Sequence, residues 1–348
     1  MSTSPPTQYK DNYKIRNRKE YNKSLCQRGS LTLWLEDSLL QEWESTSKKK
    51  KEVVEQTYSD SIIQCCLLQR INYRLKLRQS TGFIQGLFFL MGKNYFAVPD
   101  YSTLCRRQKS LPIEIKSRLE SGEKLAIGID STGLKVYGEG EWKVRKPGWS
   151  KHRTWRKLHI CIDLDTQEIL SVELTGNDAD DATVASKMLE GKTGNILRFH
   201  GDGAYDKFGL REVLGSGIEQ IIPPPKNAVI QKAKGKKPLP DYLIQRNGAV
   251  EYINKHGSES WKKQNGYHRG SLNEVVMFRY KTILGGELDA RTVENQKTEI
   301  KVKNFLKLNY PPPKEVAFRS IYGYATENSL NVKGKAGITL PPAKQVGF

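Results

Sequence analysis

Three acidic residues in this chain have local surroundings that suit metal-assisted phosphoryl transfer. Asp130 follows the apolar run KLAIGI, Asp202 lies between glycines in FHGDGAYD, and Glu274 lies in YHRGSLNEVVMFRYK. A buried strand seldom carries an acid unless its charge is paired or binds a metal ion. Neighbouring strands lie roughly 4.8 Å apart, so carboxylates on adjacent strands can reach a common pair of ions. The three acids therefore predict a two-metal site of the kind that activates one oxygen and stabilises another.

The ligand set and its neighbours indicate which ion and substrate such a site would take. Magnesium prefers oxygen ligands and often completes its coordination with a substrate phosphate. Gly201 and Gly203, on either side of Asp202, let a phosphate backbone come close. We therefore expect Mg²⁺ as the cofactor, with Mn²⁺ able to substitute for it.

Each acid also has a simpler structural interpretation. Asp130 begins DSTG and Asp202 precedes a glycine, and both patterns are good turn chemistry. Glu274 can be an ordinary exposed helix glutamate. The composition favours the metal-site hypothesis, because 57 Lys and Arg against 38 Asp and Glu give a net charge of +19. Such a charge points to a polyanionic partner, most often nucleic acid, although a basic solvated surface is the alternative.

Spacing around Glu274 adds a second argument. Tyr267, Glu274 and Lys281 are separated by seven residues each. Seven residues of α-helix turn through about 700°, so a continuous helix places all three on one stripe. Glu274 would then hold a metal ion while Tyr267 and Lys281 contact a phosphate. A surface stripe with ordinary charge spacing is the alternative.

The pattern from residue 122 onward predicts a mixed α/β sheet. KLAIGID and TGLKVYG favour a hairpin around Ser131, and residues 156–165 and 166–176 favour two further strands. A helix over DADDATVASKMLEG then precedes the strand NILRFHGD, which ends at Asp202. Antiparallel strands followed by alternating strand and helix are typical of a mixed sheet. Residues 226–248, rich in Lys, Gly and Pro, favour an insertion or a long loop.

Residues 58–118 favour three helices. Asp60 is a candidate N-cap for the first helix, whose apolar residues recur every four positions. The third, PDYSTLCRRQKSL, carries Arg106 and Arg107. Two helices followed by a basic third resemble a helix-turn-helix module, in which we expect Arg106 and Arg107 to read DNA bases. A plain helical bundle is the alternative.

The cellular compartment follows from what the sequence lacks. The five cysteines show no spacing typical of a metal site, which favours free thiols in a reducing compartment. The N-terminal MSTSPPTQYKDNYK lacks the apolar core of a signal peptide, and no apolar stretch reaches about 18 residues. We expect a cytoplasmic protein without a membrane partner.

Four segments together resemble the DDE transposases of bacterial insertion sequences, of the IS5 family within the broader IS4-like group. They are GIDSTGLKVYG, WRKLHICIDLD, FHGDGAYD and YHRGSLNEVVMFRYKTILGGELDARTVENQKTE. The resemblance runs from about residue 57 to about residue 308. It implies a ribonuclease-H-like core in which Asp130 and Asp202 are the paired aspartates and Glu274 is the third acid. It also implies Mg²⁺ as the cofactor and the ends of a mobile element as the substrate.

The third motif of that family reads Tyr, two residues, Arg, three residues, Glu, six residues, Lys. Tyr267, Glu274 and Lys281 match it, whereas Gly270 occupies the arginine position and Arg269 lies one residue early. One residue on a helix is a swing of about 100°. We expect Tyr267, Arg269 and Lys281 to contact DNA.

The combined prediction is a four-part chain. A polar basic segment covers 1–56, a helical DNA-binding domain 57–120, a ribonuclease-H-like catalytic domain 121–308 with a basic insertion at about 226–260, and an irregular tail 309–348.

The predicted activity is cutting of an insertion sequence at its terminal inverted repeats and joining of those ends to target DNA. One ion on Asp130 and Asp202 would activate the attacking oxygen, and a second on Asp130 and Glu274 would stabilise the leaving oxygen. Joining two ends predicts at least a homodimer. Two alternatives remain, namely a ribonuclease-H-like nuclease without strand transfer and a catalytically impaired transposase that only binds DNA.

Overall fold

The computed structural model describes residues 26, 35–49, 58–113, 118–136, 155–233 and 238–308. The chain divides into two units, and all of these residues belong to the unit Lys19–Lys314. The predicted tail 309–348 and most of the predicted basic segment 1–56 lie outside the described residues. Among the helices that are described, none has the length and apolar character needed to cross a membrane.

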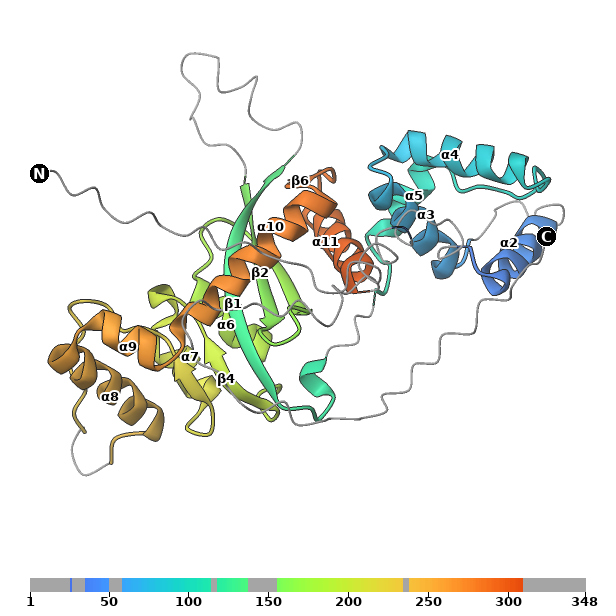
Figure 1. Ribbon diagram of the computed structural model, residues 1–348. Helices are drawn as coiled ribbons and strands as arrows, with labels where there is room; N and C mark the ends of the chain where they lie inside the picture. Colours follow the sequence, from blue (N-terminus) through green and yellow to red (C-terminus); the bar gives the residue numbers. More distant parts are fainter. Residues whose placement is uncertain are drawn as a thin grey trace, which may run out of the picture. The chain divides into compact units, whose positions relative to one another are not determined.

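A mixed sheet forms the centre of this unit (Figure 1). Its strands lie in the order β3-β2-β1-β4-β5, and β6 also pairs with β1. The pairs β1–β2 and β2–β3 are antiparallel, whereas β4 and β6 run parallel to β1, and β5 parallel to β4. The strands are β1 (Leu125–Val136), β2 (Trp155–Asp163), β3 (Ile169–Thr175), β4 (Ile196–His200), β5 (Glu219–Ile221) and β6 (Glu287–Leu288). Three antiparallel strands followed by parallel ones form a ribonuclease-H-like core, which confirms the predicted fold class.

The predicted hairpin around Ser131 is wrong, because β1 continues through that residue. Asp130 pairs with Ile160, Ser131 with His159 and Gly133 with Lys157 in an unbroken antiparallel register. The turn chemistry of DSTG is thus overridden by pairing with the nine-residue strand β2. Asp130 consequently lies within the central strand and not at its end.

Alternating residues of β1 build two cores, one on each face of the sheet. Ile127 and Ile129 join the core under α6 (Asp181–Leu189) and α7 (Phe208–Leu214). Leu134 and Val136 join the core that includes residues of α10 (Leu272–Leu284) and α11 (Val293–Leu308). Asp130 has the same parity as Leu134, so its side chain lies on the face of the sheet that α10 covers.

The N-terminal helices share the second of these cores. Buried side chains of α3 (Asp60–Asn72), α4 (Leu77–Leu90) and α5 (Tyr101–Gln108) belong to the same cluster as those of α11. Gln108 donates to the Asn295 carbonyl at 2.9 Å. The helical segment, which α2 (Asp37–Lys49) precedes, is therefore packed onto the α/β core through α11.

Two local predictions in the helical parts are corrected. Ser59, not Asp60, is the N-cap of α3, because the Ser59 side chain accepts from the Ile62 amide while Asp60 lies in the first turn. The predicted loop over 226–248 contains the start of α8 (Asp241–His256). That helix begins after Pro240, with Asp241 in its first turn and basic residues in its last, which the helix dipole favours. Helix α9 (Ser258–Gln264) and the 3₁₀ turn η5 (Tyr267–Ser271) then lead to α10.

Candidate active site

The three predicted acids line one cleft of about 180 Å³ between β1, the end of β4 and the start of α10. Asp130 projects from the middle of β1, and Asp202 follows β4 by two residues. Glu274 lies in the first turn of α10. The other lining residues are Ile129, His200, Gly201, Tyr267, His268, Gly270, Ser271 and Asn273.

The backbone fixes both aspartates. Asp130 accepts a hydrogen bond from the Ser131 amide at 2.7 Å. Asp202 accepts from the Ala204 amide at 2.8 Å and so caps the short 3₁₀ turn η4 (Gly203–Tyr205) that follows β4. The acid positions therefore follow directly from the strand and from the turn at its end.

The carboxylates interact through their charges. The pKa of Asp130 is raised from 3.8 to about 6, mainly by burial and also by the nearby carboxylates of Asp202 and Glu274, while the hydrogen bond from the Ser131 amide lowers it. Within the described parts of the chain, none of the three acids forms an ion pair with a Lys, Arg or His side chain. Charges of one sign thus meet in the cleft without compensation.

This donor set fits a divalent cation in its chemistry. All three groups are carboxylates, the ligands that Mg²⁺ prefers, and a bound cation would relieve their repulsion. The described residues contain no preformed cluster of three or more His, Cys, Asp or Glu side chains placed to enclose an ion. Side-chain movement at Asp202 and Glu274, which are both exposed, is therefore needed before the three share one.

The predicted helical stripe through Tyr267, Glu274 and Lys281 is wrong. Tyr267 lies in the 3₁₀ turn η5, which advances by three residues per turn, and α10 begins only at Leu272. Tyr267 still lines the cleft, and burial followed by the charges of Asp202, Asp130 and Glu274 raises its pKa. Lys281 does not line this cleft but donates to the Thr132 hydroxyl on β1 at 2.6 Å.

Arg269 and Gly270 take different positions. The Arg269 guanidinium pairs with Asp165 and does not line the cleft. Gly270 does line it, and the nearest atom to a Cβ at this position would be the His200 Cβ at 4.0 Å. The backbone at Gly270 thus leaves room for a Cβ.

The two predicted base-reading arginines differ in their surroundings. Arg106 is exposed on α5. Arg107 donates to the Tyr58 carbonyl at 2.7 Å and pairs with Asp60, so its guanidinium connects α5 to the beginning of α3. Arg106 is accordingly the more accessible of the two.

Sequence analysis missed the two buried polar residues that line the cleft, His200 and Asn273. His200 is buried, and burial together with the charges of Arg269 and Arg198 lowers its pKa to about 4, so its ring is neutral at pH 7. Asn273 packs against Gly128, where a Cβ would lie 2.5 Å from the Asn273 amide nitrogen. The available signals were the glycine inside LAIGID and the position of His200 two residues before Asp202.

A buried ionic cluster holds the segment that follows Asp202. The Asp206 carboxylate accepts a hydrogen bond from Arg211 Nε at 2.7 Å and another from Arg246 Nε at 3.1 Å. Arg211 also donates to Gln220 Oε1 at 3.0 Å and to the Ile222 carbonyl at 3.1 Å. We refer to Asp206, Arg211 and Arg246 as the Asp206 cluster. It connects the turn after Asp202 to α7, β5 and α8.

Comparison with known proteins identifies the family. The family model described as a transposase DDE domain matches residues 121–312, and a second model with the same description matches residues 26–139. The first match spans more than half of the chain, so the chain belongs to the DDE transposases and is an enzyme of that class.

A distant structural likeness was also found. The cryo-EM structure of the piggyBac transposase synaptic complex with hairpin DNA is similar at 12% sequence identity and a TM-score of 0.26. The alignment covers 85% of this chain and 82% of that chain.

Proposed function

We propose that this DDE transposase cuts the ends of an insertion sequence and joins them to target DNA, with Asp130, Asp202 and Glu274 holding divalent ions, preferably Mg²⁺. The observation that carries the proposal is the cleft in which three carboxylates meet without a cationic partner among the described residues. In a family of DDE transposases, and in a chain of net charge +19, such a cleft suits a phosphate substrate.

The residues of the chain have distinct roles in this proposal. Bound divalent ions would neutralise developing charge and activate the attacking oxygen. Asp130 and Asp202 supply carboxylates from β1 and from the turn after β4, and Glu274 supplies one from the first turn of α10. Tyr267, which lines the same cleft, would hydrogen-bond a phosphate oxygen. Catalysis would then depend mainly on positioning and charge neutralisation.

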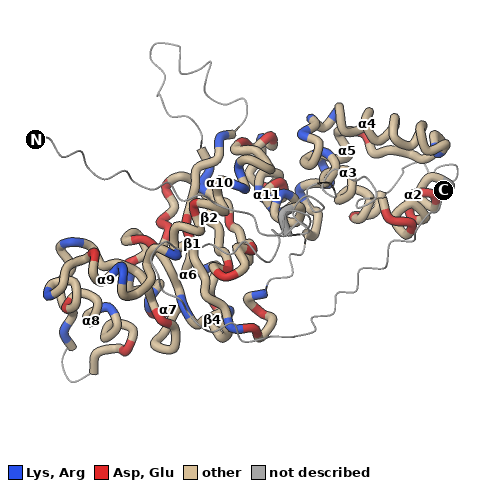
Figure 2. The backbone as a smooth tube through the Cα atoms, viewed as in Figure 1, with Lys and Arg blue, Asp and Glu red and all other residues tan. Residues whose placement is uncertain are grey.

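DNA binding would draw on basic residues outside the cleft. Lys and Arg occur on the helical segment as well as on the α/β core (Figure 2). We assign phosphate contacts to Arg269 and Lys281 and base contacts to Arg106, with Arg107 supporting α5. The substrates would be the terminal inverted repeats of an element of the IS5 family and its target DNA, bound by at least a homodimer.

An in vitro cleavage and joining assay tests the proposal. The substrate is a duplex that carries the repeat flanking the gene of this chain, with Mg²⁺ or Mn²⁺ present. Asp202→Ala and Glu274→Gln should abolish cleavage while DNA binding persists. Glu212→Gln, an exposed position on α7 outside the cleft, is the matched control and should retain activity.

The same assay separates the alternatives. Equal activity in wild type and Asp202→Ala would remove Asp202 from the site. Cleaved ends without joined product would favour a nuclease without strand transfer. Gly270, which lines the cleft at the family's arginine position, is the observation that supports a binding-only protein. Tight binding without cleavage in either metal would establish that alternative.

A further inference from the structure

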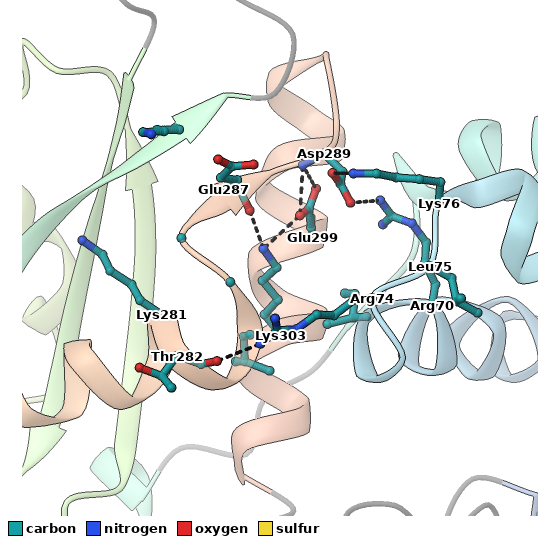
Figure 3. A pocket seen from close by; sticks show the side chains of 15 residues that line it. Arg70, Arg74, Leu75, Lys76, Lys281, Thr282, Glu287, Asp289, Glu299 and Lys303 are labelled. Carbon is teal, nitrogen blue, oxygen red and sulfur yellow. Dashed lines mark hydrogen bonds and ion pairs between the residues drawn. The ribbon is translucent and has the colours of Figure 1, made fainter.

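A second, larger pocket of about 490 Å³ lies between the turn that joins α3 to α4 and the segment α10–β6–α11 (Figure 3). Figure 3 shows Lys76, Arg70 and Lys303 directed toward Asp289 and Glu299, whereas Lys281 points away from them toward β1. Its basic lining residues are Arg70, Arg74, Lys76, Lys135, Lys281 and Lys303, and its acidic ones are Glu287, Asp289 and Glu299. We call it the basic pocket.

Three of the six cations are used in ion pairs. The Asp289 carboxylate forms an ion pair with Arg70 at 2.9 Å and another with Lys76. The buried carboxylate of Glu299 pairs with Lys303 at 3.0 Å. These contacts neutralise two of the three acids and join the helical segment to the β6–α11 connection.

The other three cations have no carboxylate partner among the residues that the structure describes. Arg74 donates to the Thr282 carbonyl at 2.8 Å, near the C-terminus of α10. Lys281 donates to the Thr132 hydroxyl at 2.6 Å. Lys135 is exposed on β1 and lies in register with Glu287 of β6, yet the two do not form an ion pair. The basic pocket therefore retains uncompensated positive charge.

The basic pocket is linked to the acidic cleft by two parallel paths. Both β1 and α10 run from the cleft to the basic pocket, and the contact between Lys281 and Thr132 joins them on the way. From Glu274 to Lys281 the helix rises about 10 Å. From Asp130 to Lys135 the strand extends about 17 Å, and Lys135, which alternates to the other face of β1 from Asp130, lines the basic pocket beside Glu287. Each DNA strand carries one phosphate per 3.4 Å of axis, so these lengths correspond to about three to five nucleotides.

We propose that the basic pocket binds a backbone phosphate of the DNA substrate about three to five nucleotides from the cleaved bond, with Arg74 and Lys135 as new phosphate contacts beside Lys281. The inference rests on the proposed function for the position of the cleaved bond. Phosphate contacts fix the register of a duplex without reading its sequence. The basic pocket thereby sets how far the DNA extends along α10 when its end lies in the acidic cleft.

Binding measurements on the full chain test this inference separately from catalysis. The probe is the flanking-repeat duplex in fluorescence anisotropy, without divalent ions, over a series of salt concentrations. Lys135→Gln should weaken binding about five- to tenfold at 0.1 M salt and reduce the slope of log K against log salt by about 0.9. Lys297→Gln, a half-exposed lysine of α11 paired with Glu173 outside the basic pocket, is the control and should leave the slope unchanged.

Two further experiments test the basic pocket. One variant should strengthen DNA binding, and one series of modified duplexes should locate the contacted phosphate. Glu287→Gln removes the acid of the basic pocket that forms no ion pair with the described residues, and it should strengthen binding several-fold. Single methylphosphonate substitutions along the duplex should weaken wild-type binding at about three to five nucleotides from the cleaved bond. That sensitivity should disappear in Lys135→Gln, because the contact is already lost.

The outcomes decide the inference. An unchanged salt slope in Lys135→Gln would overturn it, as would methylphosphonate sensitivity that persists in the variant. Competition by inorganic phosphate at constant ionic strength, without any position-specific effect in the duplex, would show a free-anion site instead and would also overturn it. If the wild-type protein does not cleave the duplex, the proposed function is contradicted. The salt dependence of DNA binding would still test the basic pocket.

Discussion

Two aspartates only four positions apart in the sequence, Asp202 and Asp206, have opposite electrostatic surroundings. The side chain of Asp206 is 2% exposed, and its carboxylate forms ion pairs with Arg211 and Arg246. Asp202 points into the acidic cleft, where it meets Asp130 and Glu274 without a cationic partner among the described residues. The Asp206 carboxylate is neutralised by arginine side chains of the same fold. The carboxylates of the cleft have no such partner among the described residues, as suits groups that would bind an ion. The contrast supports the proposal that the cleft is functional and the Asp206 cluster structural.

Substitution of single aspartates should produce the largest difference between the two regions. Asp206→Asn leaves two buried arginines without their anion and should lower the free energy of unfolding by about 3–5 kcal/mol. Asp202→Asn removes one of several repelling carboxylates and should leave that free energy unchanged or raise it. Denaturant unfolding of both variants measures the effect. Equal destabilisation would mean that Asp202 is as structural as Asp206.

The pH dependence of stability should report the crowded charge of the cleft. The folded pKa of Asp130, about 6, lies above its ordinary 3.8, so its protonated form stabilises the folded state and this contribution is lost as pH rises through 6. Without divalent ions, Asp130→Asn should therefore gain stability over wild type between about pH 4 and pH 6, with a constant difference above.

Divalent ions should offset the loss of stability that wild type suffers when Asp130 ionises. Mg²⁺ at a hundredfold excess over its Kd adds about 2.7 kcal/mol to stability. We expect the rise in Tm to be larger at pH 7 than at pH 5, because protons compete for Asp130, and smaller in Asp130→Asn. A Mg²⁺ effect that is equal at both pH values would argue against Asp130 as a ligand.

Gly270→Arg should produce the smallest effect of these substitutions, a change in DNA affinity. It tests the cleft by adding a positive charge to it. The nearest atom to a Cβ at this position is 4.0 Å away, so a side chain can begin there without a clash, and an arginine adds a cation beside the open carboxylates. We expect DNA affinity to rise about fivefold, or about 1 kcal/mol, at low salt. Gly270→Gln is the uncharged control, and an equal rise in both variants would exclude a charge effect.

The sequence predicted the sheet and the acids but not the long-range contacts. Asp130, Asp202 and Glu274 were found because each stands beside a strand or helix pattern that can be recognised locally. The hairpin at Ser131 was a wrong prediction because local turn chemistry does not show the competing partner strand β2. The helical stripe was wrong because η5 and α10 meet at Leu272, and a spacing of seven does not reveal that change of helix type.

Contacts between distant residues explain the rest. Arg246 reaches Asp206 across 40 positions, and Arg107 reaches Tyr58 across 49. Neither pair has a sequence signal, since any arginine and any acid or carbonyl would look the same. The Asp206 cluster and the structural use of Arg107 therefore became visible only in three dimensions.

Direct measurement of divalent-ion binding tests the central claim most closely. Mn²⁺ is titrated calorimetrically into wild type, Asp130→Asn, Glu274→Gln and the control Glu212→Gln, with and without a DNA duplex. We expect wild type and the control to bind Mn²⁺ equally and both cleft variants to bind at least about tenfold more weakly, because each loses a carboxylate ligand. Equal Mn²⁺ affinity in all four proteins would contradict the claim that these carboxylates share divalent ions.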